Sequence, residues 1–176
     1  MSGGERARVL RRLGREAEEA IDFGEFDLGV DAEEFGGVGH DLAVDAVARE
    51  VSPLIYSARG PDDAAVQGFD ALVQRTGCDK AQASERIGMA LAEIMRRLLD
   101  QTALRRIVVA GGDSSGAVAS HLGVQALTVS AGMAPGVPLC RVWSDNPRRD
   151  GLEMALKGGQ LGAPSFYGDV RAGRVG

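Results

Sequence analysis

The sequence lacks the features that mark three large classes of protein. No apolar run approaches the roughly 18 residues that a membrane-spanning helix requires. The only two cysteines, Cys78 and Cys140, lie far apart and lack the spacing of a disulfide framework or a zinc site. The net charge of −5 argues against nucleic acid as the main partner, since that requires a concentrated basic surface. We therefore expect a cytoplasmic protein that has neither a membrane nor a nucleic acid as its partner.

Histidines and aromatic residues are also few, whereas the apolar and charged contents are ordinary. The two histidines, His40 and His121, sit near no cluster of cysteines or acids, so we predict no metal-ligating residues. An apolar content of 44% and a charged content of 26% are typical of a soluble globular protein. A chain of 176 residues supports one sizeable core, so residues 1–176 are expected to form a single domain.

Hydrophobic periodicity predicts helices in the first part of the chain and strands in the last part. Thirteen of the 25 glycines lie in the last 76 residues, between short β-like runs. The expected fold class is therefore α/β, with helices flanking a mixed sheet and a glycine-rich, β-like C-terminal part. The predicted helices are 5–21, 40–52 and 79–100, with a further one before 79; the predicted strands are 53–58, 105–111, 126–134, 138–144 and 152–159; and 22–40 is predicted to be a long loop.

The most informative stretch is "RRIVVAGGDSSGAVASHLG", residues 105–123, in which a strand runs through a glycine-rich turn into a helix. Such a turn presents backbone N–H groups and the positive end of a helix dipole, which favour an anion, above all a phosphate. Ser114 and Ser115 are candidates to cap the helix and to donate to phosphate oxygens. Asp113 is either the N-cap or a partner of Mg²⁺, because it would otherwise repel phosphate. The alternative is a capped turn whose glycines serve only packing.

A second glycine cluster follows the last predicted strand, in "LEMALKGGQLGAPSFY". Lys157 ends that strand and directly precedes Gly158 and Gly159, so its ammonium group is placed to reach a phosphate. The alternative is a surface lysine beside a hairpin turn. Neither cluster has the spacing of the two standard nucleotide fingerprints, Gly-x-x-x-x-Gly-Lys-Ser/Thr and Gly-x-Gly-x-x-Gly.

Taken in order, "GGDSSGA", "APGVPL", "DGLEMALKGGQLG" and the aromatic pair in "PSFY" resemble the C-terminal nucleotide-binding domain of the four-carbon acid sugar kinases. This family is also labelled type III effector Hrp-dependent outer protein. The stretch "PLIYSARGPDD" matches the middle of that domain in character and position, so the resemblance is clearest over residues 53–176.

The resemblance implies that the chain binds ATP and Mg²⁺ for phosphoryl transfer to a four-carbon sugar acid held by a separate N-terminal domain. That substrate domain has no counterpart here, and only Ser2-Gly3 could remain of the family's serine-rich opening segment. The missing part is expected either in a longer protein or in a separate subunit, and it would supply the general base. The nucleotide-binding residues carried over are Gly112, Asp113, Ser114, Ser115, Gly116, Lys157, Gly158 and Gly159.

Two functions are therefore weighed. In the first, the chain is the ATP-binding domain of a sugar-acid kinase, and it phosphorylates nothing by itself because no acceptor pocket is visible. In the second, it is a stand-alone nucleotide- or anion-binding module that acts in regulation or partner binding without turnover. A pure interaction protein is a third, weaker alternative.

Overall fold

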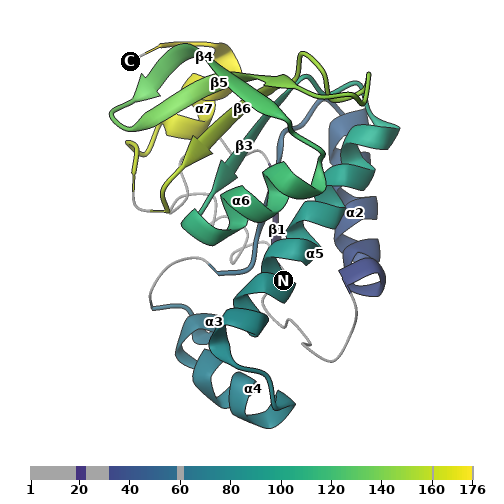
Figure 1. The fold of residues 1–176 in the computed structure, drawn as a ribbon, viewed down its shortest axis with the longest axis vertical. Helices are drawn as coiled ribbons and strands as arrows, with labels where there is room; N and C mark the ends of the chain where they lie inside the picture. The colour runs from purple at the N-terminus through teal and green to yellow at the C-terminus, as the bar shows by residue number, and fades with distance from the viewer. Residues whose placement is uncertain (1–18, 23–31, 59–61, 160, 176) are drawn as a thin grey trace.

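The computed structural model describes residues 19–22, 32–58, 62–159 and 161–175, with only the backbone described at 19–22, 32–39, 113 and 114 (Figure 1). No helix in these ranges is both long and apolar enough to cross a bilayer. The helices are α2 (Ala32–Ala48), α3 (Ala64–Gln67), α4 (Phe69–Thr76), α5 (Lys80–Gln101), α6 (Gly112–His121) and α7 (Phe166–Ala172). The strands are β1 (Glu19–Asp22), β2 (Pro53–Tyr56), β3 (Arg106–Ala110), β4 (Ala126–Ala134), β5 (Val137–Trp143) and β6 (Glu153–Lys157).

The main sheet has four strands in the order β3-β6-β5-β4. Strands β3 and β6 run parallel, whereas β5 is antiparallel to both of its neighbours, β4 and β6. Strands β1 and β2 pair with each other in parallel as a second, two-stranded sheet. The predicted α/β class, with helices beside a mixed sheet, is therefore confirmed.

Helices cover both faces of the main sheet. Ile107 and Val109 face the core that α5 and α6 form, together with Val142 and Met154. Val108 points the other way and packs against the cluster that contains residues of α7. The expectation that the apolar run of β3 is buried on both faces is confirmed, because successive side chains of a strand alternate between its two faces.

Helix α5 matches its prediction closely. Asp79 caps it, accepting a hydrogen bond from the Gln82 N–H at 2.8 Å while the Gln82 side chain accepts one from the Asp79 N–H at 3.0 Å. This reciprocal pair is a capping box. At Gly88 an added Cβ would lie 3.2 Å from Cβ of Ala117 on α6, so the two helices approach closely there. Helix α5 thereby fixes the position of α6 against the sheet.

Two predictions about the first 40 residues are wrong where the structure tests them. Strand β1 covers residues 19–22 and pairs with β2, although residues 19–21 belong to the predicted helix 5–21. The rest of that predicted helix, residues 5–18, lies outside the described part. The predicted loop 22–40 contains the first nine residues of α2. Glycines at 36, 37 and 39 weaken the local helix signal, but Ala43 packs with Ile94 and Leu98 of α5. That tertiary packing outweighs the low propensity.

Candidate functional site

The two glycine clusters lie side by side because they follow two neighbouring parallel strands. Ala110 at the end of β3 is in register with Lys157 at the end of β6. One residue later, the Gly111 N–H donates to the Lys157 carbonyl oxygen at 2.9 Å. Ligands of α/β sheets bind beyond the carboxyl ends of the strands, which is where both clusters stand.

Helix α6 begins without a side-chain cap among the described residues. Its N-cap is Gly111, at φ 125° and ψ 140°, a conformation that only glycine adopts without strain. The expectation that Asp113 or Ser114 is the N-cap is therefore wrong, although both residues do lie in the first turn. The side chains of these two residues lie outside the described part of the structure. The first N–H groups of α6 accordingly face the loop with no described side chain to satisfy them.

Ser115 has a different role from the one expected. Its Oγ donates to the Gly111 carbonyl oxygen at 2.6 Å and so braces the turn from inside the helix. The hydroxyl proton is engaged within the loop, which leaves Oγ only as an acceptor. The prediction that Ser115 caps the helix is wrong, because the residue lies one turn after the N-cap.

Open space surrounds three of the predicted site glycines. Among the described residues, a Cβ added at Gly112, Gly116 or Gly159 would meet no atom within 4 Å, apart from chain neighbours and the helix's own backbone. At Gly158 the added atom would lie 3.2 Å from the Leu161 side chain, so the space there is narrower. The backbone of Gly112, Gly116 and Gly159 is therefore open to the approach of a ligand.

Lys157 is buried, with 7% of its surface exposed, so the alternative of a surface lysine beside a hairpin turn is excluded. Its Nζ donates to the carbonyl oxygens of Gly158 at 3.1 Å and Gly159 at 3.0 Å. Among the described residues no carboxylate pairs with it. Burial lowers the pKa of the Lys157 ammonium group below the usual 10.5. The site thus holds a partly desolvated cation that has no counter-ion in the described part of the chain.

Two aromatic side chains at the start of α7 form a wall beside this cation. Lys157 Nζ lies 5.8 Å from the ring centroid of Phe166 and 6.0 Å from that of Tyr167. The rings contact each other edge to face. Burial raises the pKa of Tyr167. The sequence analysis used this pair only as part of the resemblance; its position after the second glycine cluster was the available signal for a role in the site.

Known proteins can now be compared with this geometry. The family model described as the nucleotide-binding C-terminal domain matches residues 38–167. The chain belongs to that family.

Two curated relatives of this nucleotide-binding domain are kinases. The 3-oxo-isoapionate kinase of Paraburkholderia graminis is 57% identical over 133 residues, which cover 76% of this chain and 28% of that protein. The 3-oxo-tetronate kinase of Cupriavidus necator is 37% identical over 117 residues, 66% of this chain and 24% of that protein. The chain therefore spans about a quarter of the length of these relatives. The resemblance to the four-carbon acid sugar kinases is confirmed.

Solved structures share the fold at low sequence identity. The Haemophilus influenzae protein HI1011, of family DUF1537, has a TM-score of 0.65 and 19% identity, with coverage of 96% of this chain and 37% of that chain. A DUF1537 domain from Bordetella bronchiseptica, described with bound citrate as a domain-swapped dimer, has a TM-score of 0.57 and 19% identity, with coverage of 97% and 37%.

Proposed function

We propose that residues 1–176 form a single domain that binds ATP for a kinase whose substrate is a four-carbon sugar acid. The observation that carries this proposal is the buried Lys157 cation, which ends strand β6 and has no described counter-ion; the start of α6 has no described side-chain cap. An unpaired buried charge is costly unless a ligand of opposite charge accompanies it. The phosphates of a nucleotide would supply that charge.

Each part of the site has a definite task in this proposal. The phosphates lie between the first turn of α6 and Lys157, against the bare backbone of Gly112, Gly116 and Gly159. The N–H groups of α6 and its dipole hold the anion, and a buried ammonium group strengthens the interaction because little water screens it. Phosphoryl transfer needs mainly such positioning and charge stabilisation.

Mg²⁺, when bound with ATP, neutralises part of the phosphate charge. In the described residues no group of three side chains could hold a metal ion by itself. The donor set therefore fits a cation held mainly by phosphate oxygens, with the carboxylate of Asp113 as the one acidic group in the loop sequence.

The acceptor sugar acid belongs to another part of the kinase in this proposal. Because the chain corresponds to about a quarter of its kinase relatives, we place the acceptor pocket and the general base in the remaining N-terminal part. The isolated chain then binds nucleotide but transfers no phosphoryl group, since donor and acceptor must be held at close range. The free thiols of Cys78 and Cys140 fit a cytoplasmic enzyme.

Calorimetry and thermal unfolding of the chain with Mg-ATP, Mg-ADP and adenosine test the proposal. A ligand present at about 100 times its Kd stabilises the native state by about 2.7 kcal/mol, so both Mg-nucleotides should raise the melting temperature. Adenosine, which lacks phosphates, should raise it less. The absence of both binding heat and a melting shift with saturating Mg-ATP would contradict the proposal. ADP release that depends on a sugar acid would contradict the placement of the acceptor pocket outside this chain.

A further inference from the structure

Strand β3 has the sequence of an interior strand but lies at the edge of its sheet. Its run Ile107-Val108-Val109 carries no charge, and both of its faces are covered. Among the described residues it pairs only with β6. Exposed edge strands are usually protected by charges, prolines or bulges, whereas uncharged runs are typical of strands with a neighbour on each side. The second edge of β3 therefore looks like a place for another strand.

The hydrogen bonds to β6 identify the backbone groups on that second edge. The Glu153 N–H donates to the Arg105 carbonyl at 2.8 Å, and the Gly111 N–H donates to the Lys157 carbonyl at 2.9 Å. Backbone groups of a strand point alternately to its two sides, so the odd-numbered residues of β3 face β6. The N–H and C=O groups of Arg106, Val108 and Ala110 consequently point away from β6.

A cavity of about 580 Å³ lies beside the amino-terminal half of β3, where residues 105–108 line it. Leu54 and Ile55 of β2 line it opposite Val108 of β3, so it separates the two sheets. Leu98 of α5 and Val170 of α7 also line the cavity. Among the described lining residues the charged ones are Arg105, Arg106, Glu153 and Arg171, and Arg106 is paired with Glu153 at 2.7 Å. We call this cavity the strand slot.

Strand β2, which also lines the slot, has one open edge among the described residues. It pairs only with β1 among the described residues, and both strands have four residues. A two-stranded sheet of this size is marginally stable alone. A strand inserted between β2 and β3 would join the two sheets into one and give both strands a second neighbour.

We propose that the strand slot receives an extended, apolar strand from the substrate-binding part of the kinase. This inference rests on the proposed function. The match is to a C-terminal domain and covers only 28% of the Paraburkholderia graminis relative, so most of such a kinase lies before the matched region. Backbone hydrogen bonds to both β2 and β3 would provide the affinity, and the apolar lining would select alternating apolar side chains. The inserted strand would anchor the acceptor part next to the strand that leads into the phosphate loop.

The test uses, as its partner, the portion of the Paraburkholderia graminis 3-oxo-isoapionate kinase that precedes its match to this chain. It is co-expressed with the full 176-residue chain, and backbone amide exchange is followed residue by residue. We expect the amides of Arg106, Val108 and Ala110 to gain about tenfold or more protection in the complex, because they become hydrogen-bonded. Ile107 and Val109, already bonded to β6, should change little. A complex that leaves the three even-numbered amides unprotected overturns the proposal, as does the absence of a complex.

Substitutions test the slot independently of the amides. Leu54→Lys places a charge inside the slot and should weaken the complex about tenfold or more. Val129→Lys, at a position 66% exposed on β4, is the matched control and should not weaken it. Mg-ADP binding by Leu54→Lys should equal that of the parent, which separates this proposal from the nucleotide site. Unchanged partner binding by Leu54→Lys would overturn the proposal that the slot receives the partner's strand. Weakened Mg-ADP binding would instead place the nucleotide there, and a chain dimer abolished by Leu54→Lys would assign the slot to a second copy.

Discussion

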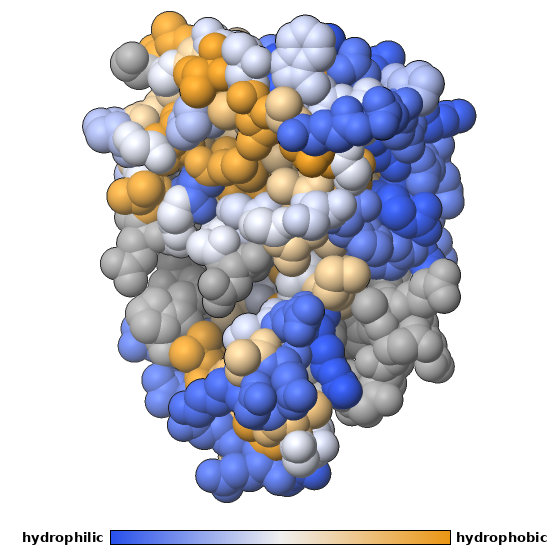
Figure 2. Space-filling view, in the orientation of Figure 1, coloured by the Kyte–Doolittle hydropathy of each residue, from blue (hydrophilic) through white to orange (hydrophobic). Residues whose placement is uncertain are grey.

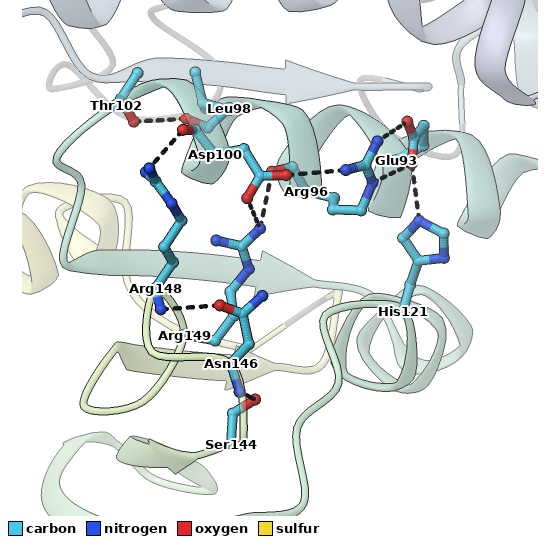
Figure 3. Close-up of polar contacts among 10 residues, drawn as sticks. All are labelled: Glu93, Arg96, Leu98, Asp100, Thr102, His121, Ser144, Asn146, Arg148 and Arg149. Carbon is cyan, nitrogen blue, oxygen red and sulfur yellow. Dashed lines mark hydrogen bonds and ion pairs between the residues drawn. The ribbon is translucent and has the colours of Figure 1, made fainter.

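The buried charged side chains at the two ends of the parallel pair β3 and β6 differ in their partners. Near their amino ends, where α5 and α6 terminate, buried charges are matched by opposite charges and hydrogen bonds (Figure 3). At their carboxyl ends the buried Lys157 has, in the described part of the chain, two backbone carbonyls and no carboxylate as partners. Figure 2 adds that much of the surface over the strands of the main sheet is hydrophobic. The ion-paired end stabilises the fold, and the other end is where we propose that a ligand binds.

Glu93 is the centre of the paired end. Its side chain, on α5, is 7% exposed and accepts hydrogen bonds from Arg96 at 2.7 Å and Arg97 at 2.6 Å. Nε2 of His121, in the last turn of α6, lies 2.9 Å from the same carboxylate. The hydrogen bond from Arg96 is the main reason that the pKa of Glu93 is well below its usual value, with smaller contributions from His121 and Arg97.

A second ion pair fixes the start of β6. Arg149, 2% exposed in the loop before β6, donates through Nη2 to Asp100 at 2.6 Å and to the Arg96 carbonyl at 3.2 Å. Arg148 donates to the Asp100 carbonyl at 3.0 Å (Figure 3). The network therefore holds α5, the end of α6 and the β5–β6 loop together. Helix α6 is thus fixed at its carboxyl end, whereas its amino end, where we propose that the ligand binds, has no side-chain cap among the described residues.

The largest effect on nucleotide binding is expected from Gly116→Val, which alters the carboxyl end of the β3–β6 pair and leaves the ion-paired end intact. Among the described residues an added Cβ at this glycine meets no atom within 4 Å, so the variant should fold. In the proposed function its side chain would occupy the space of the ligand. Nucleotide binding should fall below detection in calorimetry, and Gly112→Val should behave alike. Gly132→Val on β4, where an added Cβ also meets nothing, is the control. Near-parental binding by both site variants would show that these glycines serve packing.

The next largest effect is expected from Glu93→Gln, which breaks the paired end. Removing one partner of a buried ion pair costs about 3–5 kcal/mol; we expect the lower limit because Arg96 and Arg97 are partly exposed and can hydrate. Urea unfolding measures this loss. Asp70→Asn, in an exposed pair with Lys80, should change stability by about 0.5 kcal/mol or less. A comparably small loss for Glu93→Gln would contradict the structural role of the network.

The Glu93 carboxylate also makes the free energy of unfolding depend on pH. Because the folded pKa of Glu93 is lowered, its contribution is complete above the unfolded value of 4.5 and is lost as the pH falls below that value. The parent should therefore lose stability more steeply below 4.5 than Glu93→Gln does. Parallel curves of unfolding free energy against pH would contradict this expectation.

Lys157→Met should weaken nucleotide binding less than Gly116→Val does. Unlike Glu93→Gln, it should affect binding and not stability. A charged hydrogen bond is worth about 1.5–3 kcal/mol, so ATP should bind about tenfold or more weakly, while adenosine binding is unchanged. Stability should not fall, since burial of the lysine disfavours its charged form. Titration calorimetry and urea unfolding measure the two quantities, with the exposed Lys80→Met as control. Parental ATP affinity would place the phosphates elsewhere.

The pH dependence of ATP binding follows from the same lysine. Its pKa is lowered, so the ammonium group loses its proton below the usual 10.5, and ATP affinity should fall with rising pH before an ordinary lysine titrates. Lys157→Met should lack this fall. Added salt should have little effect, because the group is 7% exposed.

Ser115→Ala should have the smallest effect on binding. The hydroxyl proton is already donated to Gly111, and loss of a neutral hydrogen bond costs about 0.5–1.5 kcal/mol. Most of that loss should appear in urea unfolding, with less than about a tenfold change in ATP affinity. A larger loss of affinity than that caused by Lys157→Met would mean that the serine contacts the nucleotide directly.

The sequence by itself determined the features that depend on neighbouring residues. The apolar run of β3, the Asp79 cap of α5 and the glycine turn before α6 each involve a few consecutive residues whose backbone preferences agree. Fold class and both candidate loops were predicted from such signals. Local signals were misleading before residue 40, where α2 depends on packing against α5 and β1 on pairing with β2.

Only the tertiary structure decided which of these local features meet and which charges are buried. The two glycine clusters are more than 40 residues apart in sequence, and the pairing of β3 with β6 brings them together. Whether Lys157 lies on the surface depends on the fold of Phe166 and Tyr167 over it, and Glu93 is matched by His121, 28 residues away. Burial and ion pairing are properties of the packed chain, because they depend on how much water and which charges surround a group. The linear pattern contains the helical spacing of Glu93 with Arg96 and Arg97, but neither the burial of this carboxylate nor its contact with His121.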